Sequence, residues 1–111
     1  MVKSRLKGRF IQLKISQNML SKLPINLDKV SQEDINKEIA RIGMIAELDA
    51  VNLYEQLAQM AQDETLKKIL LDIAKEEKTH IGEFQAILLK KDPEQLDELK
   101  KGEEEVARLS Q

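Results

Sequence analysis

The sequence predicts an all-α protein: an antiparallel two-helix hairpin followed by a short C-terminal helix. Two observations support this fold class. The 111 residues are 34% charged, contain no Trp and only four Gly and two Pro, and are rich in good helix formers. Two long stretches also repeat apolar residues at heptad spacing. Because long helices of a short chain enclose little core alone, we expect two copies to dimerise into a four-helix bundle.

We divide the chain into a basic N-terminal extension and lead-in, residues 1–30, and a helical domain, residues 31–111. The first part holds seven Lys/Arg and one acid, a charge of +6, and the second holds eleven Lys/Arg and nineteen acids, a charge of −8. Residues 1–18 are either a solvated tail or a docking segment for an acidic partner or membrane surface.

Several functional classes are disfavoured by composition. The chain has no Cys, which excludes disulfides, thiolate metal sites and cysteine nucleophiles. The acidic body and the single Tyr argue against nucleic acid binding. No apolar run approaches the length of a membrane span, and the first residues lack the apolar core of a signal peptide. We therefore expect a cytoplasmic protein that binds no nucleic acid and no membrane.

The first helix is expected to begin at Ser31 and to end near Ala61. Ser31 and Asp34 resemble a capping box, with Asp in place of the usual Glu or Gln. Seven positions at heptad spacing form what we call the first seam: Ala40, Met44, Glu47, Val51, Tyr54, Ala58 and Ala61. A further apolar stripe predicts that this helix packs against two neighbours, one of which belongs to another chain: Ile35, Ile39, Ile42, Leu53, Leu57 and Met60.

The second helix is expected to follow a turn near Gln62-Asp63, with Asp63 as its N-cap, and to end near Lys91. The same heptad spacing defines the second seam, which we expect to be buried: Leu66, Leu70, Ile73, Glu77, His80, Phe84 and Ile87. Asp92-Pro93 then opens a third helix over residues 93–108, because Pro is favoured at the first helical position. We expect Gly102 to interrupt that helix.

Three potential metal ligands occupy seam positions where apolar residues are expected. Glu47 lies on the first seam, and Glu77 and His80, the only His of the chain, lie on the second. A carboxylate in an apolar seam is costly unless a partner such as a cation neutralises it. Glu47 precedes the turn by about as many residues as Glu77 and His80 follow it, so the three should lie at one height of the hairpin.

Glu77 and His80 form a Glu-x-x-His pair on one face of a helix, and their carboxylate and imidazole suit iron, manganese or zinc. Di-iron helical bundles use this pair twice, with one further Glu from each of two other helices. One chain supplies half of that set: Glu47, Glu77 and His80. A complete site, with two iron ions per dimer, therefore needs a second copy of the chain.

The same residues are also compatible with structural roles. His80 could be a core histidine hydrogen-bonded to Glu47 or Tyr54 without metal, and Glu77 could be a partly exposed residue. Tyr54 is either a core tyrosine or a residue that orients Glu47 or takes part in electron transfer. Asp49 is either a surface acid or part of an ion route to the site.

These residues resemble the encapsulated ferritin family, short ferritin-like proteins packed inside encapsulin shells. The likeness covers about Met19 to Leu109 and is most specific in IAELDAVNLYEQ at 45–56, ILLDIAKEEKTH at 69–80 and DPEQ at 92–95. It is strongest to the archaeal type, in which such a domain is fused ahead of a shell-forming domain.

The resemblance implies metal ligands at Glu47, Glu77 and His80 and a site tyrosine at Tyr54. It also implies a ferritin-like homodimer, a ring of dimers (a decamer), and a ferroxidase that oxidises Fe(II) to Fe(III) with O2 and stores iron within an encapsulin nanocompartment. The chain departs from some members at Ala46, where they carry an outer-site carboxylate, and at Leu53, where they carry Trp. Two alternatives are a rubrerythrin-like di-iron peroxidase and a non-enzymatic helical adaptor whose Glu/His pair sets dimer register.

Overall fold

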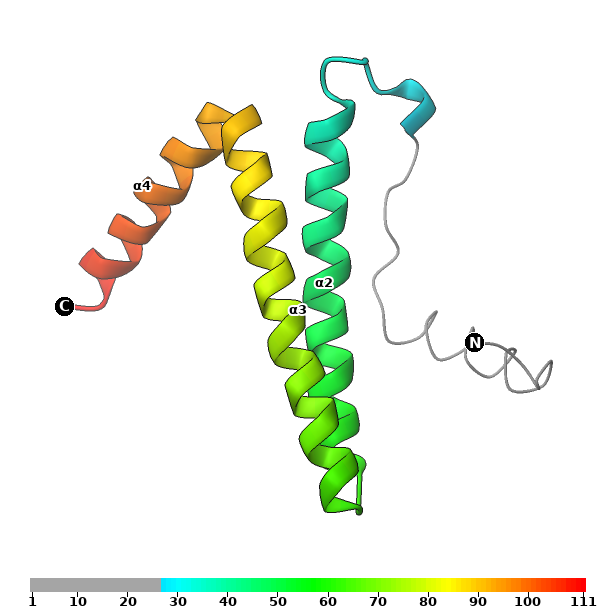
Figure 1. Ribbon diagram of the computed structural model, residues 1–111. Coiled ribbons are helices and arrows are strands. Elements are labelled where there is room, and N and C mark those ends of the chain that lie inside the picture. Colours follow the sequence, from blue (N-terminus) through cyan, green and yellow to red (C-terminus); the bar gives the residue numbers. More distant parts are fainter. Residues whose placement is uncertain (1–26) are drawn as a thin grey trace.

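The computed structural model describes residues 27–111, and this part of the chain is all-helical (Figure 1). A short 3₁₀ turn, η1 (Leu27–Lys29), precedes three α-helices: α2 (Ile35–Met60), α3 (Glu64–Lys91) and α4 (Pro93–Leu109). No strand occurs within residues 27–111, and the all-α prediction is confirmed. The extension predicted at 1–30, including the docking hypothesis for 1–18, falls almost entirely outside the described residues.

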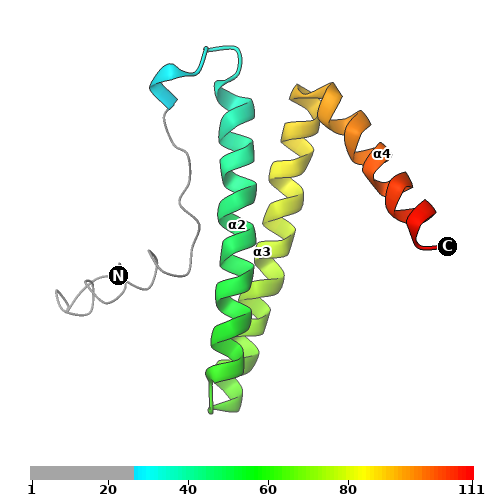
Figure 2. The ribbon, with the colours of Figure 1, turned by 180° about the vertical axis from the view of Figure 1, so that it is seen from behind.

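Helices α2 and α3 form the predicted antiparallel hairpin. They lie side by side in opposite views of the molecule, joined by the short turn at residues 61–63 (Figures 1 and 2). Helix α4 leaves the far end of α3 and slopes away from the hairpin, so that it contacts α3 mainly near their junction. No helix among residues 27–111 combines the length and apolarity required to cross a bilayer.

Helix α2 begins four residues later than predicted. Ser31 and Asp34 do interact: the Asp34 N–H donates to the Ser31 carbonyl (3.0 Å) and hydroxyl (3.3 Å), and the Ser31 hydroxyl donates to Asp34 Oδ2 (3.1 Å). These bonds close a turn ahead of the helix, however, and Asp34 itself becomes the N-cap residue. The local pairing was predicted correctly, but the i to i+3 backbone bond places it outside the α-helix.

The starts of α3 and α4 agree with the prediction. Asp63 Oδ2 accepts the Leu66 N–H at 2.7 Å, and Asp92 Oδ1 accepts the Gln95 N–H at 3.1 Å. The predicted interruption of the third helix at Gly102 is wrong, because α4 runs unbroken to Leu109. One Gly in a helix costs only about 1 kcal/mol, which a good N-cap offsets.

The hairpin core is small, and it confirms only one of the two seams. The buried apolar side chains are Ala40, Val51, Ala58, Ala74 and Leu88. Three of them lie on the first seam. On α3, however, the buried residues are one position past seam members Ile73 and Ile87, and Ile87 remains 46% exposed. Helix α3 carries two adjacent apolar stripes but has only one neighbour in the hairpin, so one stripe packs on α2 and the second seam stays half-exposed.

The corner between α3 and α4 is tied back to α2. Arg41 Nη2 lies 2.7 Å from Asp92 Oδ2, while the other oxygen of Asp92 caps α4. The Gln95 N–H and, after it, the Arg41 guanidinium hold the pKa of Asp92 below its usual value despite partial burial. One carboxylate thus fixes both the start of α4 and its attachment to the hairpin.

Candidate metal centre

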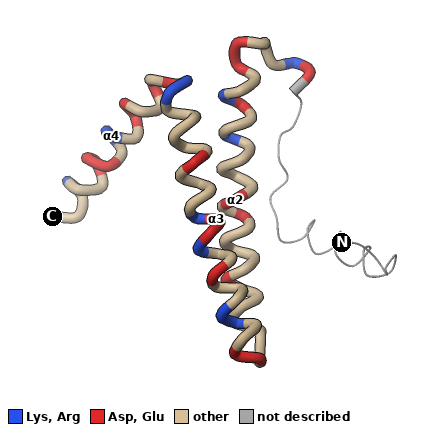
Figure 3. Tube along the Cα trace, viewed as in Figure 1, with Lys and Arg blue, Asp and Glu red and all other residues tan. Residues whose placement is uncertain are grey.

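Glu47, Glu77 and His80 come together at mid-height of the hairpin. Glu47 projects from α2, and the other two project from α3, where their i, i+3 spacing puts them on one face. Acidic positions of the two helices meet in this region of the Cα trace (Figure 3). The antiparallel register predicted from the distances to the turn is therefore found in the structure.

The distances show a tight group centred on one ring nitrogen. His80 Nδ1 lies 2.9 Å from Glu47 Oε2 and 2.8 Å from Glu77 Oε1. One contact crosses between the helices, and the other stays within α3. Ligand atoms of the three residues all lie within 4.8 Å of one another. Two donors that bind the same ion at about 2.0–2.2 Å are separated by a similar distance, so the three residues are close enough to share one ion.

The group sits at the edge of the hairpin rather than inside it. The side chains of Glu47 and Glu77 are 19% and 16% exposed, whereas that of His80 is 45% exposed. The hydrogen bond to Glu77 and the negative charges of both glutamates raise the pKa of His80 above its ordinary value, against a smaller opposing effect of burial. The carboxylates therefore favour a positive charge at this position, whether carried by the imidazole or by a metal ion.

The donor set fits a transition-metal ion. Two carboxylates and one imidazole suit iron, manganese or zinc better than calcium or magnesium. These three ligands leave coordination positions open, and one Glu plus one Glu-x-x-His pair is half of a di-iron carboxylate set. His80 lies on the second seam, and Leu66 and Ile87, at heptad intervals from it, are 47% and 46% exposed.

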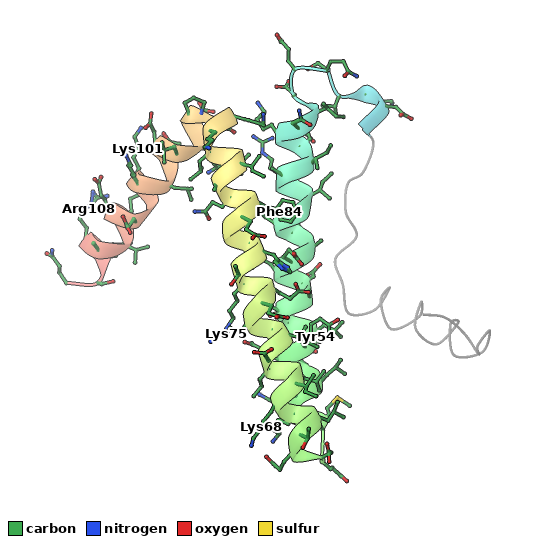
Figure 4. All side chains as sticks on the ribbon, viewed as in Figure 1. Tyr54, Lys68, Lys75, Phe84, Lys101 and Arg108 are labelled. Carbon is green, nitrogen blue, oxygen red and sulfur yellow. The ribbon has the colours of Figure 1, made fainter. Side chains whose placement is uncertain are left out.

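Tyr54 is not part of this group. It lies on α2 one heptad nearer the turn than Glu47 (Figure 4) and is half-buried. Its hydroxyl forms no hydrogen bond with residues 27–111. Residues one heptad apart are separated by about 10 Å along the helix axis. The role of Tyr54 therefore stays a prediction. Asp49 is half-buried, and it too lies outside the three-residue group.

One interaction beside the group was not predicted from the sequence. Lys78, next to Glu77, crosses to α2 and places its Nζ 3.1 Å from Glu55 Oε2. Both side chains are about half-exposed, so the pair contributes little stability. Its sequence signal is weak, because charged residues at many positions of both helices could pair in this way.

Comparisons with known proteins agree with this arrangement. Residues 23–104 match the EncFtn-like family. The chain is 57% identical over 86 residues to a ferritin-like-encapsulin shell fusion protein of Pyrococcus furiosus and 34% identical over 67 residues to the encapsulin nanocompartment cargo protein EncC of Myxococcus xanthus. The matched segments are 78% and 60% of this chain but only 25% and 51% of those relatives.

A solved structure shares the fold. The crystal structure of the encapsulated ferritin domain from Pyrococcus furiosus aligns with a TM-score of 0.70 and 56% sequence identity. The alignment covers 81% of this chain and 94% of that one. The two chains are therefore similar in amino-acid sequence as well as in fold.

Proposed function

Because the chain belongs to the EncFtn-like family, we propose that it is a ferroxidase that oxidises Fe(II) to Fe(III) with dioxygen at a di-iron site shared by two copies. The observation that carries this proposal is the convergence of Glu47, Glu77 and His80 on one point of the hairpin. The named relatives support a ferritin-like protein, and the donor set supports iron.

A homodimer would complete the site. One hairpin offers half of the di-iron ligand set, and His80 is the only His of the sequence, so the second half must come from another copy. Apolar side chains on the same face of α3 support this partner, since Leu66 and Ile87 are 47% and 46% exposed. Two copies packed through this face would form a four-helix bundle, and a ring of such dimers, a decamer, is the assembly that the family resemblance implies.

The protein residues have distinct roles in the proposed reaction. Glu47 and Glu77 attract and bind the substrate Fe(II), and the unprotonated His80 completes the donor set of each iron. Two bound Fe(II) ions would supply one electron each, so that one dioxygen molecule would be reduced to hydrogen peroxide as two protons are taken up from water. Tyr54, one heptad from Glu47, is proposed to orient the site or take part in electron transfer, and it is not needed to hold iron.

The surroundings of the protein are proposed from its relatives. One is named as an encapsulin shell fusion protein and another as an encapsulin cargo protein. We therefore expect this chain to work inside an encapsulin nanocompartment in the cytoplasm, where the shell retains the ferric product. The hairpin itself encloses no space that could store mineral, and a surrounding shell would supply it.

The test is oxygen-dependent Fe(II) oxidation, followed by the absorbance of Fe(III) after anaerobically loaded protein is mixed with oxygenated buffer. Glu47→Ala and His80→Ala should each reduce the rate to that of Fe(II) in buffer, because each removes a ligand. Asp72→Ala is the matched control, since it removes an exposed carboxylate of α3 outside the group and should oxidise iron at the wild-type rate.

Three results would contradict the proposal. Wild-type oxidation rates in Glu47→Ala or His80→Ala would remove the three residues from the reaction. Faster turnover with peroxide than with dioxygen would favour the rubrerythrin-like peroxidase instead. A purified protein that binds no iron at all would favour the non-enzymatic helical adaptor, in which the Glu/His group only sets the register of the dimer.

A further inference from the structure

Helices α2 and α3 leave no room for a side chain at Gly43, one helical turn from the candidate metal-binding group. A Cβ atom placed on Gly43 of α2 would lie 2.7–2.8 Å from three ring carbons of Phe84 of α3. Carbon atoms do not pack closer than about 3.5 Å without strain, so the ring of Phe84 occupies the space that a side chain at position 43 would need. In Figure 4 the labelled Phe84 lies at the junction of the two helices.

The position of this contact relates it to the metal ligands. Gly43 is four residues before Glu47 on α2, and Phe84 is four residues after His80 on α3. Because the helices are antiparallel, both steps run in the same direction, about 6 Å toward the open end of the hairpin. The contact therefore lies about one helical turn from the point where Glu47 meets His80, between the same two helices.

The three ligands depend differently on that separation. Glu77 and His80 share α3, so their 2.8 Å contact is internal to one helix. Glu47 comes from α2, so its 2.9 Å contact with His80 depends on how closely the two helices approach. A small shift between the helices therefore changes the distance from Glu47 to His80 and leaves the distance from Glu77 to His80 unchanged.

We infer that Gly43 and Phe84 are positioning residues, which set the distance between Glu47 of α2 and the Glu77–His80 pair of α3. The aromatic ring seated on the bare Cα of Gly43 holds the helices at the spacing that brings ligands from both of them onto one ion. The inference rests on the proposed function, in that the three ligands are taken to bind a metal ion.

The opposite end of the group shows why Gly43 is the sensitive position. Toward the turn, the helices pack through the buried side chains of Val51 and Ala74, ordinary core residues. At Gly43, by contrast, one added methyl group would meet an aromatic ring below van der Waals distance. A surface groove lies beside the ring and is lined by Ile39, Ile87 and neighbouring residues. The ring of Phe84 could rotate into this groove if a side chain were added at position 43.

The test uses Gly43→Ala, Phe84→Leu and their combination, with Gly82→Ala as the matched control. Gly82 is also a helical glycine, two residues from His80, but a Cβ there would meet nothing within 4 Å. Helix propensity favours Ala over Gly at both positions. A loss of binding at position 43 but not at position 82 therefore isolates the contact with Phe84.

The first measurement is the affinity of metal-free protein for Co(II), which is determined by calorimetric titration. Gly43→Ala is expected to weaken binding by about tenfold to a hundredfold, the usual effect of changing a residue that supports metal ligands. Phe84→Leu should also weaken it, by leaving the helices underpacked. The double variant should recover most of the affinity, because the smaller Leu makes room for the methyl group of Ala.

The second measurement is a crystal structure of metal-free Gly43→Ala, which does not depend on activity. The distance from Glu47 to His80 should increase, while that from Glu77 to His80 stays as in the wild type. An unchanged distance from Glu47 to His80, with the Phe84 ring turned into the groove, would overturn the inference. If Gly43→Ala does not fold, Phe84→Leu and the double variant decide: a folded double variant that binds Co(II) no more tightly than Phe84→Leu would overturn the inference as well.

Failure of this inference differs from failure of the proposed function. If wild-type protein binds no Co(II), or His80→Ala binds it equally well, the metal site itself is wrong. If wild-type protein binds Co(II), His80→Ala does not, and folded Gly43→Ala binds like the wild type, the site stands and the positioning role is wrong.

Discussion

His80 has a dual character that follows from its two neighbours. With both carboxylates within 2.9 Å of Nδ1, the pKa of His80 is raised, so the metal-free group favours a proton on the ring. A metal ion requires the unprotonated ring. Proton and metal ion therefore compete for the same nitrogen, and pH should affect the stability of the empty and loaded protein in opposite directions.

We expect metal-free protein to lose stability as pH rises from about 6.5, the usual pKa of His, into the alkaline range. The folded-state pKa of His80 lies above its unfolded value, so the stabilisation is complete below about 6.5 and is lost as pH rises through the folded-state pKa. The effect should be small, because the half-exposed ring is screened by water. Thermal unfolding of wild type and His80→Gln across this range would measure it, and parallel curves for the two would contradict it.

Among the helices, α4 depends on a single residue for both its start and its direction. Asp92 caps α4 with one oxygen and accepts a hydrogen bond from Arg41 of α2 with the other. Asp63 caps α3 in the same way, but no side chain from another helix in residues 27–111 binds it. The two caps therefore allow a comparison of an N-cap aspartate with and without a link to α2.

Asp92→Ala should therefore cost more stability than Asp63→Ala. Loss of either N-cap should cost about 1 kcal/mol, and loss of the contact with Arg41 should add a smaller cost for Asp92. Urea unfolding at one fixed chain concentration would compare the variants. Arg41→Ala would remove the link to Asp92 together with the longer, 3.5 Å contact between Arg41 and Glu38. Equal losses for the two caps would show that the contact between Arg41 and Asp92 contributes nothing.

At the scale of the whole molecule, the described helices bury little apolar surface within a single chain. Its buried apolar side chains are three Ala, one Val and one Leu, and no large side chain is fully buried. Many large apolar residues remain exposed: Ile39, Ile45, Leu48, Met60, Leu66, Ile69, Leu71, Ile87, Leu96, Leu99, Val106 and Leu109. Such a surface is typical of a chain that is covered by further copies.

We expect Fe(II) to drive association of the chain. Native mass spectrometry of anaerobic protein should show a shift from monomers toward dimers or larger assemblies on addition of Fe(II), with about one iron per chain. In the proposed site each iron would draw ligands from both copies, so that iron binding would favour association. His80→Ala should bind less iron and associate less. An iron-loaded wild-type monomer, or an assembly unaffected by Fe(II) and by this substitution, would contradict a shared site.

Much of the fold and of the candidate site was predictable because it depends on local chemistry and periodicity. Asp63 and Asp92 were recognised as caps from their own neighbours, and heptad spacing placed Glu47 opposite Glu77 and His80. The start of α2 was misplaced by four residues, because the pairing of Ser31 with Asp34 is compatible both with a helix and with the turn before it.

The order of residues along the chain specifies which side chains can bind a metal ion and which helices carry them, because helical spacing and donor chemistry are local properties. It does not specify which stripe of α3 packs on α2, or how closely the helices approach at Gly43 and Phe84; the folded hairpin settles both. The distance between two helices depends on side chains that are far apart in the sequence. The residues around a small residue such as Gly43 do not reveal which large residue of the other helix packs against it.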